Sequence, residues 1–232
     1  MMKVLAFDTS SKALSVAILD GEQLLADVTV NVKKNHSINL MPAIDFLMNS
    51  VDLKPADLDR IVVAQGPGSY TGLRVAVATA KTLAYALGIE LVGVSSLYAL
   101  AAATEFSGMI VPVMDARRNN VYAGFYRDGQ LVKEEAHMAF PELLAAVQDE
   151  KDVLFVGEVA PFQTQIEEAL PKAQVLPVLP SAYAIGKYGQ TLAPVDVDSF
   201  VPNYLKRVEA EENWLKNHEE NPHADYIKKK KK

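Results

Sequence analysis

The feature of this sequence that most restricts its fold is a pattern that occurs twice. Residues 4–25 contain three short apolar runs; the first ends at Asp8, and an Asp-Gly pair separates the last two. Residues 111–132 repeat this order, with Asp115 at the position of Asp8. An Asp-Gly pair between apolar runs is a strong signal for a two-residue β-hairpin. The repeat therefore predicts a duplicated domain whose two copies each begin with three hairpin-linked strands.

The segments after each copy alternate between helical and strand patterns, which predicts a mixed sheet with helices on its faces. In the first half we expect helices at 38–50, 72–87 and 96–106, and strands at 60–64 and 91–94. In the second half we expect helices at 141–149, 161–170 and 181–193, and a strand at 153–157. The pattern thus predicts two similar α/β subdomains with a cleft between them and then a charged tail: 1–107, 108–205 and 206–232.

Composition narrows the class of protein. A run of about 18 apolar residues, which a membrane span needs, does not occur, and the apolar stretch at the N-terminus is too short for a signal peptide. These features favour a cytoplasmic protein. The sequence has no cysteine, which excludes disulfides and thiolate metal ligands, and its net charge of −6 argues against strong nucleic-acid binding by the folded body.

The tail is rich in charge and ends in five lysines, Lys228–Lys232. Such a run is usually solvated, so we expect disorder there. An expression remnant and an arm that touches RNA are the less favoured interpretations.

A glycine-rich segment joins the predicted strand at 60–64 to the helix at 72–87. It lacks the Gly-Lys-Ser/Thr of a P-loop and the glycine spacing of a dinucleotide fingerprint. Glycine permits backbone angles that side chains forbid, proline stiffens a turn, and serine or threonine can cap the following helix. Such a turn can bring backbone N–H groups to an anion, or it can be a tight capped turn without a ligand. We favour the structural turn, whose members are Gly66, Pro67, Gly68, Ser69, Thr71 and Gly72.

Asp8 and Asp115 are related by the repeat. Across a cleft, the two carboxylates could bind Mg²⁺ as a pair. Alternatively, each could end its strand and cap its own turn, which is the interpretation that we favour.

Two predicted helices of the first half are apolar around most of their circumference. In the helix near 38–50, the clearly polar residues are Asp45, Asn49 and Ser50, and the helix at 72–87 shows a similar excess of apolar and small residues. A helix that covers a sheet and faces water on its outer side should have a single apolar stripe. The second apolar face could lie under a neighbouring helix of the same chain or against another protein.

These residues carry a resemblance to a known family. The sequence resembles the bacterial TsaB family over about residues 2–205, in four motifs: Asp8-Thr9-Ser10, His36-Ser37, Gly66-Pro67-Gly68-Ser69-Tyr70-Thr71-Gly72-Leu73-Arg74 and Asp115-Ala116-Arg117-Arg118. The resemblance implies the actin/hexokinase-like (ASKHA) fold, a duplicated βββαβα unit. It also implies a subunit that pairs with the catalytic subunit TsaD. The TsaB–TsaD–TsaE assembly moves a threonylcarbamoyl group from an adenylate onto adenosine 37 of tRNAs that read codons beginning with A. Older usage labels the family peptidase-like.

The resemblance also implies that this chain is not the catalyst. TsaD-like sequences place a His-x-x-x-His metal motif where this chain has Ser96 and Leu100, and leucine cannot ligate a metal. The turns at 9–12 and 116–120, which approach nucleotide phosphates in the superfamily, contain no glycine. We therefore expect no catalytic residue, metal or cofactor. An independent ATP-cleft kinase or ATPase of the same superfamily is the alternative, and the Asp8/Asp115 pair is the feature that favours it.

In the resembled family, the two apolar first-half helices form the subunit interface. The resemblance thus implies a homodimer when the protein is alone, a heterodimer with TsaD, contact with TsaE through that heterodimer, and contact with tRNA only indirectly. The interface residues that we expect are His36, Leu40, Ala43, Ile44, Leu47, Leu73, Arg74, Val77 and Lys81.

Overall fold

The computed structural model describes residues 1–32 and 36–206. The first half contains β1 (Lys3–Asp8), β2 (Leu14–Asp20), β3 (Gln23–Val30), α1 (His36–Ser50), β4 (Arg60–Gly66), α2 (Tyr70–Leu87), β5 (Glu90–Ser95) and α3 (Ser96–Ala101). The second half contains β6 (Met109–Asp115), β7 (Asn120–Arg127), β8 (Gln130–Ala139), α4 (Phe140–Ala146), β9 (Val153–Gly157), α5 (Gln163–Ala169), β10 (Gln174–Leu176) and α6 (Ala182–Gly189). The tail at 206–232 lies almost entirely outside the described residues.

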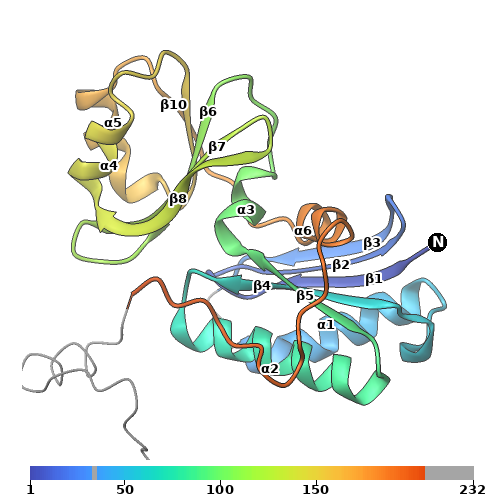
Figure 1. The fold of residues 1–232 in the computed structure, drawn as a ribbon. Coiled ribbons are helices and arrows are strands. Elements are labelled where there is room, and N and C mark those ends of the chain that lie inside the picture. The colour runs from blue at the N-terminus through green and yellow to red at the C-terminus, as the bar shows by residue number, and fades with distance from the viewer. Residues whose placement is uncertain (33–35, 207–232) are drawn as a thin grey trace, which may run out of the picture.

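The two halves build sheets of the same topology. The strand orders are β3-β2-β1-β4-β5 and β8-β7-β6-β9-β10, so each strand of the first sheet has a counterpart in the second. In both sheets the first three strands are antiparallel and the later strands add in parallel. The two sheets form separate layers with α3 between them (Figure 1). The expected duplicated α/β fold with mixed sheets is therefore confirmed.

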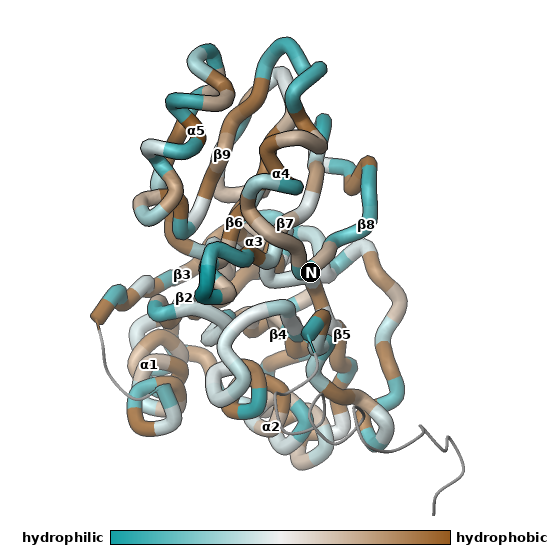
Figure 2. Tube along the Cα trace, turned by 90° about the vertical axis from the view of Figure 1, so that its left-hand side faces the viewer, coloured by the Kyte–Doolittle hydropathy of each residue, from teal (hydrophilic) through white to brown (hydrophobic). Residues whose placement is uncertain are grey.

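Both faces of the first sheet are buried, because successive side chains of a strand point to opposite sides. On β1, Leu5 and Phe7 pack in a core with α1 and α2, while Val4 and Ala6 pack with α6 on the other face. The second sheet has its own core beneath α4 and α5, and its central strands β6 and β9 are mostly hydrophobic (Figure 2).

The last helix of each half covers the sheet of the other half. Helix α6 packs on β1 and β2, whereas α3 packs on β6, β7 and β9. The guanidinium of Arg60, on β4, donates to three carbonyl oxygens at and just after the end of α6, those of Gly189, Gln190 and Leu192, and so fixes α6 to the first sheet. We call the first sheet with α1, α2 and α6 the first unit, and the second sheet with α3, α4 and α5 the second unit.

The expected domain boundaries need correction at this point. The sequence assigned residues up to 205 to the second subdomain, but α6 and the segment after it pack against the first unit. Phe200 lies in the core under α1 and α2, and the backbone N–H of Asn203 donates to the carbonyl oxygen of Gln65. The repeat gives the order of the elements, but it does not say which sheet a helix covers.

Several helices are shorter than expected. The helix predicted at 96–106 ends at Ala101, and the one predicted at 181–193 ends at Gly189. In the second case Gly189 packs closely on Val62, and Arg60 takes the terminal carbonyl groups. The short strand β10 was not predicted. Among the described residues, no helix combines the length and apolar character needed to cross a membrane.

Candidate functional site

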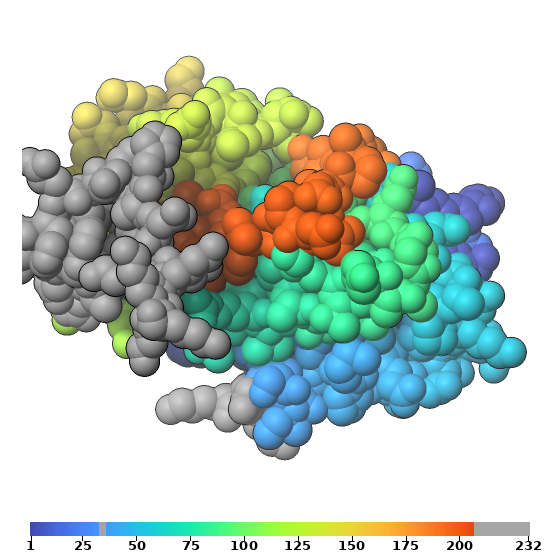
Figure 3. Space-filling view, turned by 60° about the horizontal axis from the view of Figure 1, so that its bottom comes forward, coloured from blue at the N-terminus to red at the C-terminus, as the bar shows by residue number. Residues whose placement is uncertain are grey.

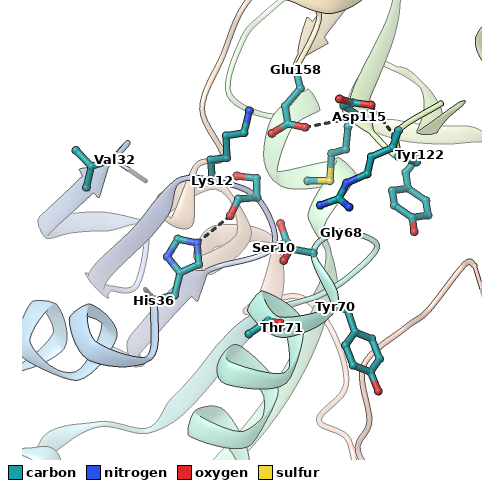
Figure 4. Close-up of a pocket in the computed structure, with 15 residues that line it drawn as sticks. Ser10, Lys12, Val32, His36, Gly68, Tyr70, Thr71, Asp115, Tyr122 and Glu158 are labelled. Carbon is teal, nitrogen blue, oxygen red and sulfur yellow. Dashed lines mark hydrogen bonds between the residues drawn. The ribbon is translucent and has the colours of Figure 1, made fainter. Parts of the chain in front are cut away.

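A cleft of about 700 Å³ lies between the two units (Figure 4). One wall comes from the turn after β1, from the start of α1 and from the loop before α2. The other wall comes from the turn after β6, from β7 and from the end of β9. The lining residues are Ser10, Ser11, Lys12, Val32, His36, Gly68, Ser69, Tyr70 and Thr71 on the first side, and Met114, Asp115, Ala116, Arg117, Tyr122 and Glu158 on the second.

The glycine-rich loop before α2 packs directly on the turn after β1. A side chain at Gly68 would place its Cβ atom 2.4 Å from the carbonyl oxygen of Ser10, and one at Gly72 would lie 2.0 Å from that of Thr9. The backbone N–H of Ser69 donates to the Ser10 carbonyl at 2.6 Å. Glycine is required here because backbone meets backbone, so the motif supports the floor of the cleft.

Of the two residues expected to cap α2, Ser69 and Thr71, the structure places Ser69 at the N-cap position. Its Oγ accepts from the backbone N–H of Gly72 at 3.4 Å. Thr71 instead lies inside the first turn of α2 and lines the cleft.

Asp8 and Asp115 make the same local hydrogen bond in the two units. The Oδ1 atom of Asp8 accepts from the N–H of Ser10 at 2.6 Å, and that of Asp115 accepts from the N–H of Arg117 at 2.7 Å. Each carboxylate therefore caps its own turn, as we favoured. Within residues 1–32 and 36–206, no cluster of three or more potential metal-ligating side chains is found.

The two carboxyl groups differ in environment. Asp115 is exposed, whereas Asp8 is fully buried, and its Oδ2 atom has no hydrogen bond of normal geometry. Burial raises the pKa of Asp8 to about 6, because it disfavours the charged form; hydrogen bonds from Ser10 and the charge of His36 oppose this rise.

The turn after β6 has an uncommon backbone conformation. Arg117, Arg118 and Asn119 all have positive φ angles, of 68°, 53° and 55°. For residues with a side chain this conformation costs about 1–2 kcal/mol each. Asn120 holds the turn: its backbone N–H donates to the carbonyl oxygen of Arg117, and its side-chain amide donates to that of Arg118 at 2.9 Å. The turn is thus fixed without a glycine.

Ser96 and Leu100 are both used in packing. Ser96 is fully buried, and its Oγ accepts from the backbone N–H of Gly66 at 3.1 Å. Leu100 is 2% exposed and packs among the core residues between α3 and the second sheet, against Gly157. The Ser96 hydroxyl thus already accepts a hydrogen bond from the backbone, and Leu100 has an aliphatic side chain.

The expected interface residues need correction. Five apolar members are buried in the first unit: Leu40, Ile44, Leu47, Leu73 and Val77. All of these except Leu73 belong to the core that α1 and α2 form with the first sheet. Of the others, Ala43 is half-buried and Arg74 is exposed. The His36 ring nitrogen Nε2 lies 2.9 Å from the carbonyl oxygen of Ser11, and the Nζ of Lys81 donates to the carbonyls of Asp198 and Phe200.

The outer faces of α1 and α2 carry a different set of apolar side chains. On α1, Ile38, Met41 and Phe46 are 69%, 46% and 65% exposed; on α2, Tyr70 and Tyr85 are 41% and 77% exposed. We call these five residues the outer face. In Figure 3, α1, α2 and the segment after α6 lie side by side across this side of the first unit.

Sequence reasoning missed the segment after α6 as a part of this surface. Tyr204 meets Tyr70 with ring centroids 5.2 Å apart, and the Nε of Arg74 donates to the Tyr204 hydroxyl at 3.3 Å. The guanidinium of Arg74 also lies over the Tyr70 ring, 4.3 Å from its centroid. No local pattern could reveal contacts between residues 130 positions apart.

This chain is similar in sequence to several known proteins. The chain is 39% identical over 225 residues to the tRNA threonylcarbamoyladenosine biosynthesis protein TsaB of Bacillus subtilis, which covers 92% of this chain and 98% of that protein. The chain belongs to the TsaB family. The Escherichia coli protein of the same name is 30% identical over 55% of this chain and 56% of its own length. A family model described as TsaD, tRNA N6-adenosine threonylcarbamoyltransferase, matches residues 23–214.

Solved structures agree with this assignment. YeaZ from Pseudomonas aeruginosa matches with a TM-score of 0.76 and 28% identity, over 88% of this chain and all of that chain. A second structure, of an uncharacterized Pseudomonas aeruginosa protein with similarity to peptidase YeaZ, matches with a TM-score of 0.77 and 27% identity, over 89% of this chain and all of that one. The resemblance to the TsaB family is therefore confirmed.

Proposed function

We propose that this chain is a non-catalytic partner subunit of an assembly that forms threonylcarbamoyladenosine at position 37 of tRNA. In this assembly it pairs with TsaD, and it reaches TsaE through that pair. The observation that carries the proposal is the packing of Ser96 and Leu100. Where TsaD-like sequences hold two metal-ligating histidines, Leu100 lies in the core of the second unit.

The two turns that face the cleft support the same proposal. The carboxylates of Asp8 and Asp115 are engaged with the backbone of their own turns. The carbonyls of Thr9 and Ser10 are pressed against the glycine-rich loop, and the opposite turn is fixed by Asn120. A nucleotide phosphate normally needs a glycine-rich backbone that approaches it closely. In each unit the turn at this place has side chains at every position.

The partner surface that we propose is the outer face, not the buried set of residues expected from the sequence. Ile38, Met41 and Phe46 expose large apolar side chains on α1, and two tyrosines are exposed on α2. Aromatic residues, methionine and arginine are enriched in protein interfaces. Because TsaD resembles this chain, the same face can pair with a second copy when the protein is alone.

Co-purification with a TsaD homologue tests this proposal. Phe46→Glu places a charge on the outer face, where a partner would desolvate it, so the heterodimer should be lost. Leu131→Glu is the matched control, because Leu131 is a 47% exposed leucine on β8 of the second unit. The control should bind TsaD as the unchanged chain does. A folded Phe46→Glu protein that recovers TsaD in full would place the interface elsewhere.

The alternative, an independent ATP-cleft enzyme, is tested by nucleotide turnover. The purified chain should not hydrolyse ATP above the rate of a buffer control. Hydrolysis that disappears in a folded Asp8→Ala variant would favour the enzyme over the partner subunit.

A further inference from the structure

A single carboxylate joins the two units. Glu135 lies on β8 of the second sheet, and its Oε1 atom accepts hydrogen bonds from the hydroxyl groups of Ser95 and Tyr126. Tyr126 belongs to the neighbouring strand β7, whereas Ser95 is the last residue of β5 in the first sheet. The carboxylate therefore connects the second sheet to the point where the chain leaves the first.

Helix α3 begins directly after Ser95. The Oγ atom of Ser95 accepts from the backbone N–H groups of Leu97 and Tyr98, at 3.0 and 3.4 Å, and so caps α3 while it donates to Glu135. The position of Glu135 thus constrains both the end of β5 and the direction in which α3 starts towards the second unit.

The chain passes from the first unit to the second after Ser95 and returns just before α6. These two crossings lie close together. The Tyr98 ring of α3 stacks on Tyr188 of α6 at 4.4 Å and lies edge-on to Tyr126 at 6.0 Å. Just before α6, the backbone N–H of Ser181 donates to the carbonyl of Ala99 at 3.0 Å. Both connections between the units, one through α3 and one before α6, therefore pass through this cluster.

Burial and hydrogen bonding shift the pKa of the Glu135 carboxyl group in opposite directions. Burial raises the pKa of Glu135, and the hydrogen bonds from Ser95 and Tyr126 oppose that rise. Burying a polar group costs free energy unless its hydrogen bonds are made. Tyr126 donates from within the second sheet, so a carboxyl group in this place favours the arrangement of the units that also brings the Ser95 hydroxyl to it.

We propose that Glu135 is a latch that fixes the orientation of the two units. The walls of the cleft belong to different units: Lys12 and Gly68 lie on one side, Asp115 and Arg117 on the other. The latch therefore also sets the width of the cleft. This inference rests on the contacts of Glu135 and does not depend on the proposed function.

Distance measurements between two spin labels test the latch. The sequence contains no cysteine, so Asp27→Cys and Glu168→Cys introduce one exposed label site in each unit without further changes. In this double-cysteine protein we expect a single narrow distance distribution. Glu135→Ala should broaden it at least twofold in width or shift its maximum.

Two matched variants separate the latch from a general effect on β8. Glu134→Ala changes the exposed neighbouring glutamate and should leave the distribution unchanged. Glu135→Gln keeps a side-chain oxygen that can accept both hydrogen bonds, so it should stay close to the unchanged protein.

A narrow, unshifted distribution in folded Glu135→Ala would overturn the proposal. If Glu135→Ala does not fold, Glu135→Met, which keeps the length of the side chain and removes the acceptor, should give the broadened distribution. Failure of both variants to fold would also contradict the latch, because Glu135 would then be required for the second sheet itself.

Discussion

The buried carboxyl group of Asp8 couples the stability of this protein to pH. Its pKa is about 6 in the folded protein, above the ordinary value of 3.8. Between these two pH values the folded state binds more protons than the unfolded state, so the free energy of unfolding falls as pH rises through this window. The loss is complete about one pH unit above the folded pKa, and a shift of this size corresponds to about 3 kcal/mol.

Asp8→Asn removes this dependence, because an amide does not ionise. At pH 7.5 the variant should be more stable than the unchanged protein by about 1–3 kcal/mol, and near pH 4 the two should be nearly equal. Urea denaturation at both pH values measures the difference. Asp115→Asn, at the exposed equivalent position, is the control and should show no such gain. A variant that is less stable at pH 7.5 would show that the Asp8 charge stabilises the fold.

The glycine at position 72 should not accept a side chain. A Cβ atom there would lie 2.0 Å from the carbonyl oxygen of Thr9, and a backbone carbonyl cannot move away as a flexible side chain can. We expect Gly72→Ala to lower the free energy of unfolding by about 3 kcal/mol, the upper end of the range typical of overpacked sites. Thermal unfolding measures this loss, with Thr71→Ala, one residue earlier on the exposed side of α2, as the control. An unchanged melting temperature in Gly72→Ala would contradict the close approach of the two loops.

At the scale of elements, α1 shows why the exposed face of a helix could not be identified from the sequence alone. Both sides of this helix are apolar, so the pattern predicts that two faces are used, but not which one covers the sheet. Leu47 is 3% exposed and Phe46 is 65% exposed, although the two residues are adjacent. The sheet decides this, because Leu40, Ile44 and Leu47 share the side of α1 that meets the strands.

Leu47 and Phe46 should therefore respond differently to substitution by glutamate. Leu47→Glu buries an unpaired charge, so we expect loss of folded protein. Phe46→Glu should change the melting temperature by only a few degrees, because surface substitutions usually stay within about 0.5 kcal/mol. Circular dichroism on both variants measures the outcome. A folded Leu47→Glu protein would place the core side of α1 outward.

Other elements were predictable to different degrees. The hairpin strands and β9 follow from short apolar runs, and the hairpins also from Asp-Gly turns; both are local signals. The placement of α6 on the first sheet depends on Arg60 and on Val62, more than 100 positions away, and no local pattern contains that information. The motifs identified Asp115 and the glycine-rich loop, which line the cleft, and Asp8 beside it. They did not identify Tyr204 or Glu135, which lie outside the cleft and have partners on other elements.

At the scale of the whole molecule, the exchange of α3 and α6 makes the two units interdependent. A fragment of residues 1–107 lacks α6, which leaves Val4, Ala6 and Val62 without a cover on one face of the sheet. We expect this fragment to aggregate or to lack a cooperative unfolding transition.

Residues 1–95 joined through a flexible linker to residues 180–206 restore α6 and should fold. Thermal unfolding followed by circular dichroism compares the two fragments. Cooperative unfolding of residues 1–107 alone would show that the first sheet does not need α6.

The most direct test of the account is reconstitution of tRNA modification from purified components. With a threonylcarbamoyl adenylate, tRNA and ATP, TsaD and TsaE should form threonylcarbamoyladenosine only when this chain is added, and the chain without TsaD should form none. Omission of each protein in turn, with the modified nucleoside quantified by mass spectrometry, measures this requirement. In place of the unchanged chain, Phe46→Glu should fail to support modification and Leu131→Glu should support it. Modification of tRNA by this chain without TsaD, or full activity of TsaD and TsaE without this chain, would contradict it.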